Sequence, residues 1–121
     1  MTLQELKHLF QNSLKTIYPI SEINQLFYIS IYNRLKMSKV EVLLHINDEF
    51  ENVEILHDLE RLKTSEPIQY IYQHAIFYDL DFKVSPDVLI PRQETEELVQ
   101  MILDKNKQTH HLKILDIGTG S

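Results

Sequence analysis

The sequence predicts a mainly α protein in which a helical amino-terminal part is followed by a β-hairpin, one further helix and one strand. Three observations support this fold class. Apolar residues recur at helical spacing over most of the first 70 residues, alternation replaces that spacing near residue 80, and the two glycines lie in the last four positions. With 43% hydrophobic and 25% charged residues, the 121-residue chain has the composition of a folded protein.

The expected starts of three helices carry capping residues. Thr2 with Glu5, and Ser38 with Glu41, match the capping box in which a hydroxyl and a carboxylate satisfy two backbone N–H groups reciprocally. Asn52 is an equally good amino-terminal cap for a fourth helix. These positions divide the first 73 residues into short helices joined by short links, which is typical of a small helical bundle.

Two further helices complete a predicted five-helix bundle. Ser21 is expected to cap the second helix after Pro19, and Pro67 suits the first turn of a short fifth helix. In the fourth helix, the outward face is expected to hold Glu54, Asp58, Glu60 and Arg61. The expected core positions of the first four helices are Leu3, Leu6, Phe10, Leu14 and Ile17; Ile23, Leu26, Phe27, Ile31 and Leu35; Val40, Leu43 and Leu44; and Ile55, Leu56, Leu59 and Leu62.

The pattern changes after residue 73. Alternating residues at 80–84, a turn at 85–87 and renewed alternation at 88–90 predict a β-hairpin. Residues 93–106 return to helical spacing, with an apolar face of Leu98, Met101 and Ile102, and residues 112–117 read as a buried strand. The predicted organisation is a helical bundle over 1–73, a β-hairpin linker over 74–91 and the start of a cofactor-binding domain over 92–121.

Composition excludes several classes of protein. There is no cysteine for a disulfide or thiolate site, no apolar run near the ~18 residues of a membrane span, and no secretory signal pattern, so a cytoplasmic protein is expected. Residues 41–66 carry eight acidic against two basic side chains, and this surface should repel nucleic acid. It is either a solvated face or a docking patch for a basic partner. The six histidines lie in different predicted elements, so no metal site is expected.

The end of the chain, Asp116-Ile117-Gly118-Thr119-Gly120-Ser121, forms a glycine loop directly after the predicted strand. Such loops bring the backbone close to a ligand because glycine has no Cβ. An acid two residues before the first glycine is typical of S-adenosylmethionine loops. A nicotinamide-binding loop remains an alternative, and its third glycine would fall at position 123.

A second feature is the corner where the predicted strand 88–90 runs through Pro91 and Arg92 into an acid-led helix. A connector with a favourable helix start explains every residue there except Arg92. An arginine at such a corner can bind a carboxylate, or it can pair with Glu94 or Glu96.

Three segments together resemble the peptide chain release factor glutamine N5-methyltransferases. These are Glu-Pro-Ile-Gln-Tyr-Ile at 66–71, Leu-Ile-Pro-Arg-Gln-Glu-Thr-Glu at 89–96, and the glycine loop, in the order and spacing of that family. The chain departs from the family pattern where Gln73 and Asp79 replace glycine and where Gln93 replaces proline. The resemblance covers residues 66–121, and the preceding helices match the family in architecture only.

The resemblance implies a class I, Rossmann-like methyltransferase domain that begins near residue 92 and is truncated within its cofactor loop. The implied reaction moves a methyl group from S-adenosylmethionine to the glutamine amide of the Gly-Gly-Gln motif in release factors during translation termination. It further implies cofactor contacts from Asp116, Gly118, Thr119, Gly120 and Ser121. It also implies an active-site corner at Pro91, Arg92, Glu94 and Thr95.

The family's catalytic Asn-Pro-Pro-Tyr motif does not occur in these 121 residues. We therefore expect the chain alone to be inactive, to bind the cofactor weakly or not at all, and to serve release-factor recognition through its helical part. Its unpaired terminal strand is expected to allow self-association. The alternative is a free-standing helical module that binds a protein and has no enzymatic activity.

Overall fold

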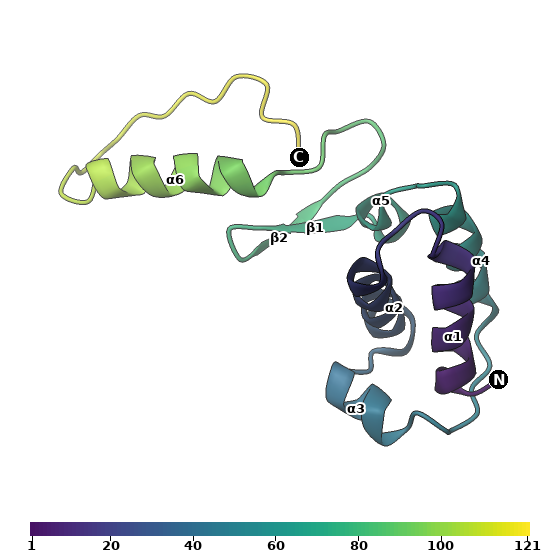
Figure 1. Ribbon diagram of the computed structural model, residues 1–121. Helices are drawn as coiled ribbons and strands as arrows, with labels where there is room; N and C mark the ends of the chain where they lie inside the picture. Colours follow the sequence, from purple (N-terminus) through teal and green to yellow (C-terminus); the bar gives the residue numbers. More distant parts are fainter. The chain divides into compact units, whose positions relative to one another are not determined.

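The computed structural model describes residues 1–121, which divide into two compact units, Met1–Ile71 and Tyr72–Ser121. Six helices and one two-stranded antiparallel sheet make up the fold (Figure 1). In chain order they are α1 (Leu3–Leu14), α2 (Ile20–Leu35), α3 (Lys39–Leu44), α4 (Val53–Lys63), α5 (Ile68–Tyr72), β1 (His74–Phe77), β2 (Leu80–Lys83) and α6 (Gln93–Lys105). The mainly α class is confirmed.

The core of the first unit lies between α1, α2 and α4. Phe10 of α1 and Phe27 of α2 are fully buried, and their rings meet edge to face with centroids 5.7 Å apart. This geometry sets the positive edge of one ring against the negative face of the other. The other fully buried apolar residues here include Leu6, Leu14, Ile23, Ile31, Val42, Ile55 and Leu62. Helical spacing of apolar residues therefore identified most of the core.

The capping predictions are confirmed at three helices and wrong at one. Both capping boxes form, at Thr2 with Glu5 and at Ser38 with Glu41, and the Asn52 side chain accepts from the Ile55 N–H at 3.1 Å. The second helix instead begins at Ile20, so Ser21 lies inside it. The reason is that Pro19 has extended backbone dihedrals and offers its carbonyl to the first free N–H groups of α2.

In α3 the exposed and buried faces are reversed relative to the expectation. Val42 is fully buried, whereas Val40, Leu43 and Leu44 are exposed. The last three lie at positions i, i+3 and i+4 and so share one face, and Val42 lies on the opposite face. A helix of six residues buries only one side, and in α3 the buried side is that of Val42. The face of α3 that was expected in the core is therefore exposed to solvent.

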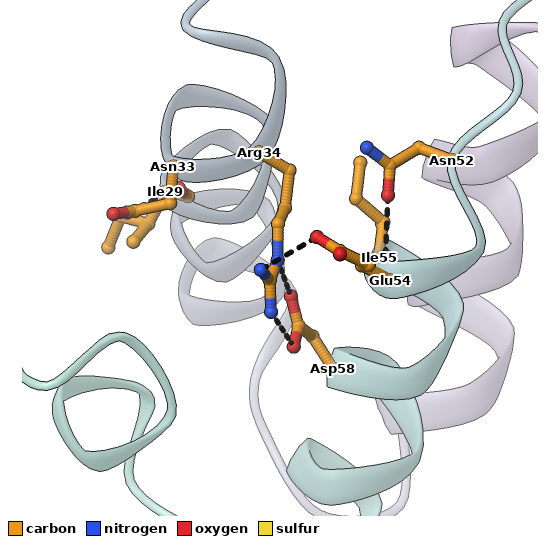
Figure 2. A network of polar contacts seen from close by, with 7 residues as sticks. All are labelled: Ile29, Asn33, Arg34, Asn52, Glu54, Ile55 and Asp58. Atoms are coloured by element: carbon orange, nitrogen blue, oxygen red, sulfur yellow. Dashed lines mark hydrogen bonds and ion pairs between the residues drawn. The ribbon is translucent and has the colours of Figure 1, made fainter.

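The expected faces of α4 are also wrong at two positions. Leu56 is 37% exposed, and Asp58 is only 1% exposed. The buried face is centred on Ile55, Leu59 and Leu62, and Asp58 lies within about 60° of that centre at 100° per residue. The Asp58 carboxylate is satisfied there by Arg34 of α2, whose Nε and Nη2 each donate to one of its oxygens at 2.7 Å (Figure 2). A polar contact that is buried on the Asp58 side and partly exposed on the Arg34 side thus links α2 to α4.

The β-hairpin forms earlier in the chain than predicted. Strand β1 pairs with β2 from His74 opposite Lys83 to Phe77 opposite Leu80, and residues 88–90 form no ladder. The alternation at 80–83 was a true strand signal, but the partner of that strand precedes it. The sequence 85–87 makes only a local turn, in which the Val88 N–H donates to the Ser85 carbonyl at 3.1 Å.

The hairpin contains the two positions at which the resemblance predicts glycine. Gln73, just before β1, has φ 60°, and Asp79, in the turn between the strands, has φ 58°. Tyr78 has φ 50°, so both central turn residues are left-handed, as a type I′ turn requires. Glycine reaches this region at no steric cost, whereas other residues are strained there. The glycine preference of these positions thus has a backbone cause.

We expect Gln73→Gly and Asp79→Gly each to stabilise the hairpin by about 1 kcal/mol, with the larger effect at Gln73 because aspartate tolerates positive φ better than glutamine. Amide exchange reports this directly, since the Val84 N–H donates to the Gln73 carbonyl at 3.1 Å. Asp81→Gly, in the middle of β2, is the matched control and should weaken the hairpin by about 0.5–1 kcal/mol. Faster exchange in the Gln73 variant would contradict the expectation.

The helix predicted over 93–106 forms as α6, but the strand predicted over 112–117 does not. No residue of α6 is buried, and its apolar residues Leu98, Met101 and Ile102 are about half exposed. Ile114, Leu115 and Ile117 are each more than 80% exposed. A strand is defined by the neighbour to which it is hydrogen-bonded, and residues 112–117 have none here. The prediction of a buried strand is therefore wrong for this structure, because apolar composition does not supply the neighbouring strand that burial requires.

Candidate functional site

The second unit contains a cavity of about 450 Å³ that gathers most of the predicted site. It is lined by Phe77, Phe82, Leu89, Ile90, Pro91, Arg92, Thr95, Val99, Asp116, Gly118, Thr119, Gly120 and Ser121. All five residues expected to contact the cofactor are present, with three of the four residues of the corner. Glu94, the fourth, does not line the cavity. Two segments about twenty residues apart in the sequence thus meet at one site.

Three structural elements supply the walls of this cavity. Phe77 of β1 and Phe82 of β2 meet edge to face, with centroids 5.8 Å apart, and form an aromatic wall. The start of α6 contributes Arg92, Thr95 and Val99. The chain after α6 returns along the helix, so that the glycine loop reaches the amino end of α6 (Figure 1). Phe77 and Phe82 thus link the hairpin to the cavity.

Tyr78 fixes the hairpin turn against α6. Its backbone N–H donates to the Glu96 carboxylate at 2.8 Å, and its hydroxyl hydrogen-bonds to the Gln100 side chain. Glu96 and Gln100 lie one turn apart on α6 and so face the same side. Of the three partners that the sequence left open for Arg92, a ligand carboxylate, Glu94 or Glu96, the last bonds to the turn instead. Its role is to hold the aromatic wall beside the helix start.

Both glycines of the loop have left-handed backbone conformations. Gly118 has φ 74° and Gly120 has φ 76°, and a Cβ built on either would meet no atom within 4 Å. The requirement for glycine in this structure is therefore conformational, because L side chains are strained at such φ. Because no atom lies within 4 Å of these positions, the space beside the loop backbone is also open to a ligand, as a cofactor-binding loop requires.

The cavity combines polar groups of several kinds with an apolar wall. Arg92 brings the positive charge, Asp116 brings a carboxylate, and Thr95, Thr119 and Ser121 bring hydroxyl groups. A carboxylate accepts hydrogen bonds from ligand hydroxyl or amino groups, and a guanidinium binds carboxylates or carbonyl oxygens. Neither lysine nor histidine lines the cavity, so the set suits binding and orientation of a polar ligand better than proton transfer at neutral pH.

The first segment of the resemblance has a structural role in the amino-terminal unit. Glu66 accepts from Arg61 Nε at 2.8 Å, and the Pro67 carbonyl accepts from the Tyr70 N–H at 2.9 Å to start α5. Hydrogen bonding by Arg61 lowers the pKa of Glu66, and Glu66 in turn raises the pKa of Arg61. Because the pKa of Glu66 is lowered on folding, this pair stabilises the fold at neutral pH and loses its contribution as the pH falls through that lowered pKa.

Nowhere do three or more histidine or carboxylate side chains come together in a way that could hold a metal ion. No helix combines the length and the apolar character that crossing a bilayer requires.

No protein-family model matches the chain. Individual known proteins do match it, one of them along its whole length. The chain is 37% identical, over 127 aligned positions that include all of it, to a release factor glutamine methyltransferase of Flavobacterium psychrophilum. It is 38% identical over 92% of its length to the protein of that name from Bacteroides thetaiotaomicron, and 61% identical over 51% of its length to that from Lactococcus lactis.

The chain spans less than half of each of these relatives: 45% of the Flavobacterium protein, 40% of the Bacteroides protein and 23% of the Lactococcus protein. Two of these matches cover 100% and 92% of the chain and so extend over the helical part in which no motif was recognised. The chain belongs to the release factor glutamine methyltransferase family.

Proposed function

We propose that residues 1–121 form the amino-terminal part of an enzyme that methylates the glutamine side-chain amide in the Gly-Gly-Gln motif of peptide chain release factors. The observation that carries the proposal is the cavity in which the corner at Arg92 meets the glycine loop. The proposal is supported by the relatives, which are named release factor glutamine methyltransferases. The methyl donor is S-adenosylmethionine, which supplies an activated methyl group when bound.

The residues of the cavity fit this cofactor. Its volume of about 450 Å³ lies within the roughly 300–1,000 Å³ of small-molecule sites. Asp116 would accept hydrogen bonds from the cofactor's polar hydrogens, and the open backbone at Gly118 and Gly120 would allow close approach. Thr119 and Ser121 add hydroxyl groups from the same loop. We assign these five residues to cofactor binding.

The corner is assigned to the substrate side of the site. Pro91 ends the extended segment and directs the chain into α6, where Arg92 and Thr95 face the cavity. There Arg92 can hold a carbonyl oxygen of the glutamine segment, and Phe77 and Phe82 exclude water from its methylene groups. Glu94 supports this corner from the first turn of α6, where its charge complements the helix dipole.

Catalysis needs more than these residues supply. An amide nitrogen is a weak nucleophile, and its lone pair has to be directed at the methyl group by hydrogen bonds to the amide. In the resemblance this is the task of Asn-Pro-Pro-Tyr, which does not occur in residues 1–121. We propose that these residues alone do not catalyse methyl transfer and that Met1–Ile71 recognises the release factor.

The 121-residue chain is expected to bind S-adenosylmethionine only weakly or not at all, because the glycine loop has no sheet to hold it in place. Isothermal titration calorimetry tests this, with the Flavobacterium relative titrated in parallel as the positive control. A dissociation constant in the low micromolar range for the 121-residue chain would contradict the expectation.

The rival function is a helical protein-binding module without enzymatic activity. The coding sequence downstream of Ser121 separates the two. Continuation into a further glycine, a ribose-binding acid and Asn-Pro-Pro-Tyr supports the methyltransferase, and a natural stop codon after Ser121 supports the module. A glycine at position 123 without Asn-Pro-Pro-Tyr would instead favour a nicotinamide-dependent enzyme.

Self-association through residues 112–117 is a separate proposal about the 121-residue chain. In an antiparallel pair of two copies, Lys113 would lie opposite Asp116, Leu112 opposite Ile117 and Ile114 opposite Leu115, so the segment is complementary to itself. We expect a dimer to appear with rising concentration in sedimentation velocity, and Asp116→Lys to weaken it by placing like charges opposite each other. A monomer at every concentration would contradict this.

A further inference from the structure

The end of the amino-terminal unit at which α1 and α4 begin has an apolar surface. We call it the α3 end. It comprises two apolar groups, the exposed face of α3 with Val40, Leu43 and Leu44, and the lining of a cavity beside α4 with Met1, Phe50, Val53 and Leu56. The acidic residues Glu41, Asp48, Glu49 and Glu51 belong to the same end. Leu44 is 75% exposed and Val53 is 81% exposed. Side chains of this kind are ordinary when scattered singly, but a group of them marks an interaction site.

The backbone of the α3 end is held by hydrogen bonds at several points. The Gln4 N–H donates to the Ile46 carbonyl at 2.9 Å, and the Phe50 N–H donates to the Met1 carbonyl at 3.0 Å. These bonds fasten the segment between α3 and α4 to the start of α1. The exposed apolar face of α3 is therefore presented by a fixed backbone, and its exposure follows from the burial of Val42 on the opposite face.

A shallow cavity of about 240 Å³ lies beside the start of α4. Its apolar lining comes from Met1, Phe50, Val53 and Leu56, and Glu51 and Asn52 complete the rim. Asn52 is fixed there because its side chain caps α4. A cavity of this size accepts one aliphatic or aromatic side chain of a partner, which is how anchor residues bind at protein interfaces.

The charge of the α3 end selects among the possible partners. Asp48 pairs with His45, whereas Glu49 and Glu51 take part in no ion pair. Hydrogen bonding by Ser38 lowers the pKa of Glu41, so this carboxylate is also ionised at neutral pH. The negative field repels phosphate backbones and anionic lipids. It equally disfavours a second copy in a two-fold arrangement, because that places the same acidic residues against one another.

We propose that the α3 end is the surface with which the amino-terminal unit binds the release factor, by receiving an apolar patch rimmed by lysine and arginine side chains. The inference rests on the proposed function and specifies which surface of Met1–Ile71 makes the contact and what chemistry it requires of the substrate protein. Val40, Leu43 and Leu44 provide the apolar contact, the cavity at Val53 receives an anchor side chain, and the carboxylates match the basic rim.

The test is calorimetric binding of the 121-residue chain to a purified bacterial release factor that carries Gly-Gly-Gln. Leu44→Ser removes apolar contact, and Glu51→Lys reverses a charge. Ile20→Ser and Glu22→Lys make the same changes at the start of α2, at the other end of the unit (Figure 1). Circular dichroism melting of each variant checks that it folds, which is expected because all four side chains are exposed.

We expect Leu44→Ser and Glu51→Lys each to raise the dissociation constant at least about tenfold, equivalent to about 1.4 kcal/mol, and the two controls to leave it unchanged. Binding should also weaken as the ionic strength rises. If the unaltered chain binds and all four variants bind equally well, the assignment of the α3 end is wrong although release-factor recognition stands. If the unaltered chain does not bind at all, recognition by this unit is itself wrong, and the docking surface with it.

Discussion

Replacing Arg34 with alanine is expected to lower the free energy of unfolding of the amino-terminal unit by about 3–5 kcal/mol. Arg34 contacts both oxygens of Asp58 at 2.7 Å, and the Asp58 side chain is only 1% exposed. Arg34 also donates through Nη1 to Glu54 at 2.9 Å, so one guanidinium joins α2 to two turns of α4 (Figure 2). Without it, a carboxylate remains in the core with its main countercharge removed.

Urea unfolding followed by circular dichroism measures this effect. Lys63→Ala is the matched control, because Lys63 pairs with Glu60 at 2.9 Å on an exposed surface, and its loss should cost less than about 1 kcal/mol. The double variant Arg34→Met with Asp58→Leu should recover most of the stability, since apolar replacement of both partners leaves no buried charge. A loss below about 1 kcal/mol for Arg34→Ala would show that solvent reaches Asp58 freely.

Amide exchange is expected to be at least about 100-fold faster in residues 93–121 than in the core turns of α1 and α2. No residue of α6 is buried, and an isolated helix of 13 residues is marginal in water. The following segment lies outside any sheet. In contrast, α1 and α2 meet through the fully buried Phe10 and Phe27, so their amides exchange only when the unit opens.

Hydrogen–deuterium exchange with mass spectrometry of the 121-residue chain measures this difference. Residues 74–83 serve as an internal comparison, because their amides are protected by the ladder of the hairpin. Equal protection of 93–121 and the α1–α2 core would contradict the expectation and would mean that the tail has found a partner. The result also bears on cofactor binding, since a glycine loop that opens readily has to be ordered before it can hold a ligand, which weakens its apparent affinity.

Short sequence patterns correctly predicted features that depend only on neighbouring residues, such as helix caps. The capping boxes at Thr2 and Ser38 form as expected because a hydroxyl and a carboxylate three residues apart reach the same helix end wherever that helix packs. The apolar spacing of α1 likewise identified its buried face. Ser21 does not cap the second helix because the helix already begins at Ile20, after Pro19. Side-chain capping preferences alone do not predict this, since Pro19 acts through its backbone.

Elements that depend on a partner were predicted less well. Residues 80–83 show alternation, but only the pairing with 74–77 decides where the hairpin turns. Residues 112–117 have the composition of a strand and no neighbour to make them one. For the candidate site, the residues of the corner and the loop were proposed from the sequence, and all of them except Glu94 line one cavity. The aromatic wall of Phe77 and Phe82 was not assigned to the site, because the sequence gives no measure of how near the hairpin lies to α6.

The helical class, three helix caps and the family resemblance could be read from the amino-acid order, because each depends on short segments of the chain. The burial of Asp58, the exposure of Val40, Leu43 and Leu44, and the cavity shared by Arg92 and the glycine loop emerge only in the folded chain. Burial and charge pairing depend on which surfaces meet, and those surfaces are distant in sequence. A helix pattern defines a face to about one residue in each turn, and the neighbouring element then selects which part of that face it covers.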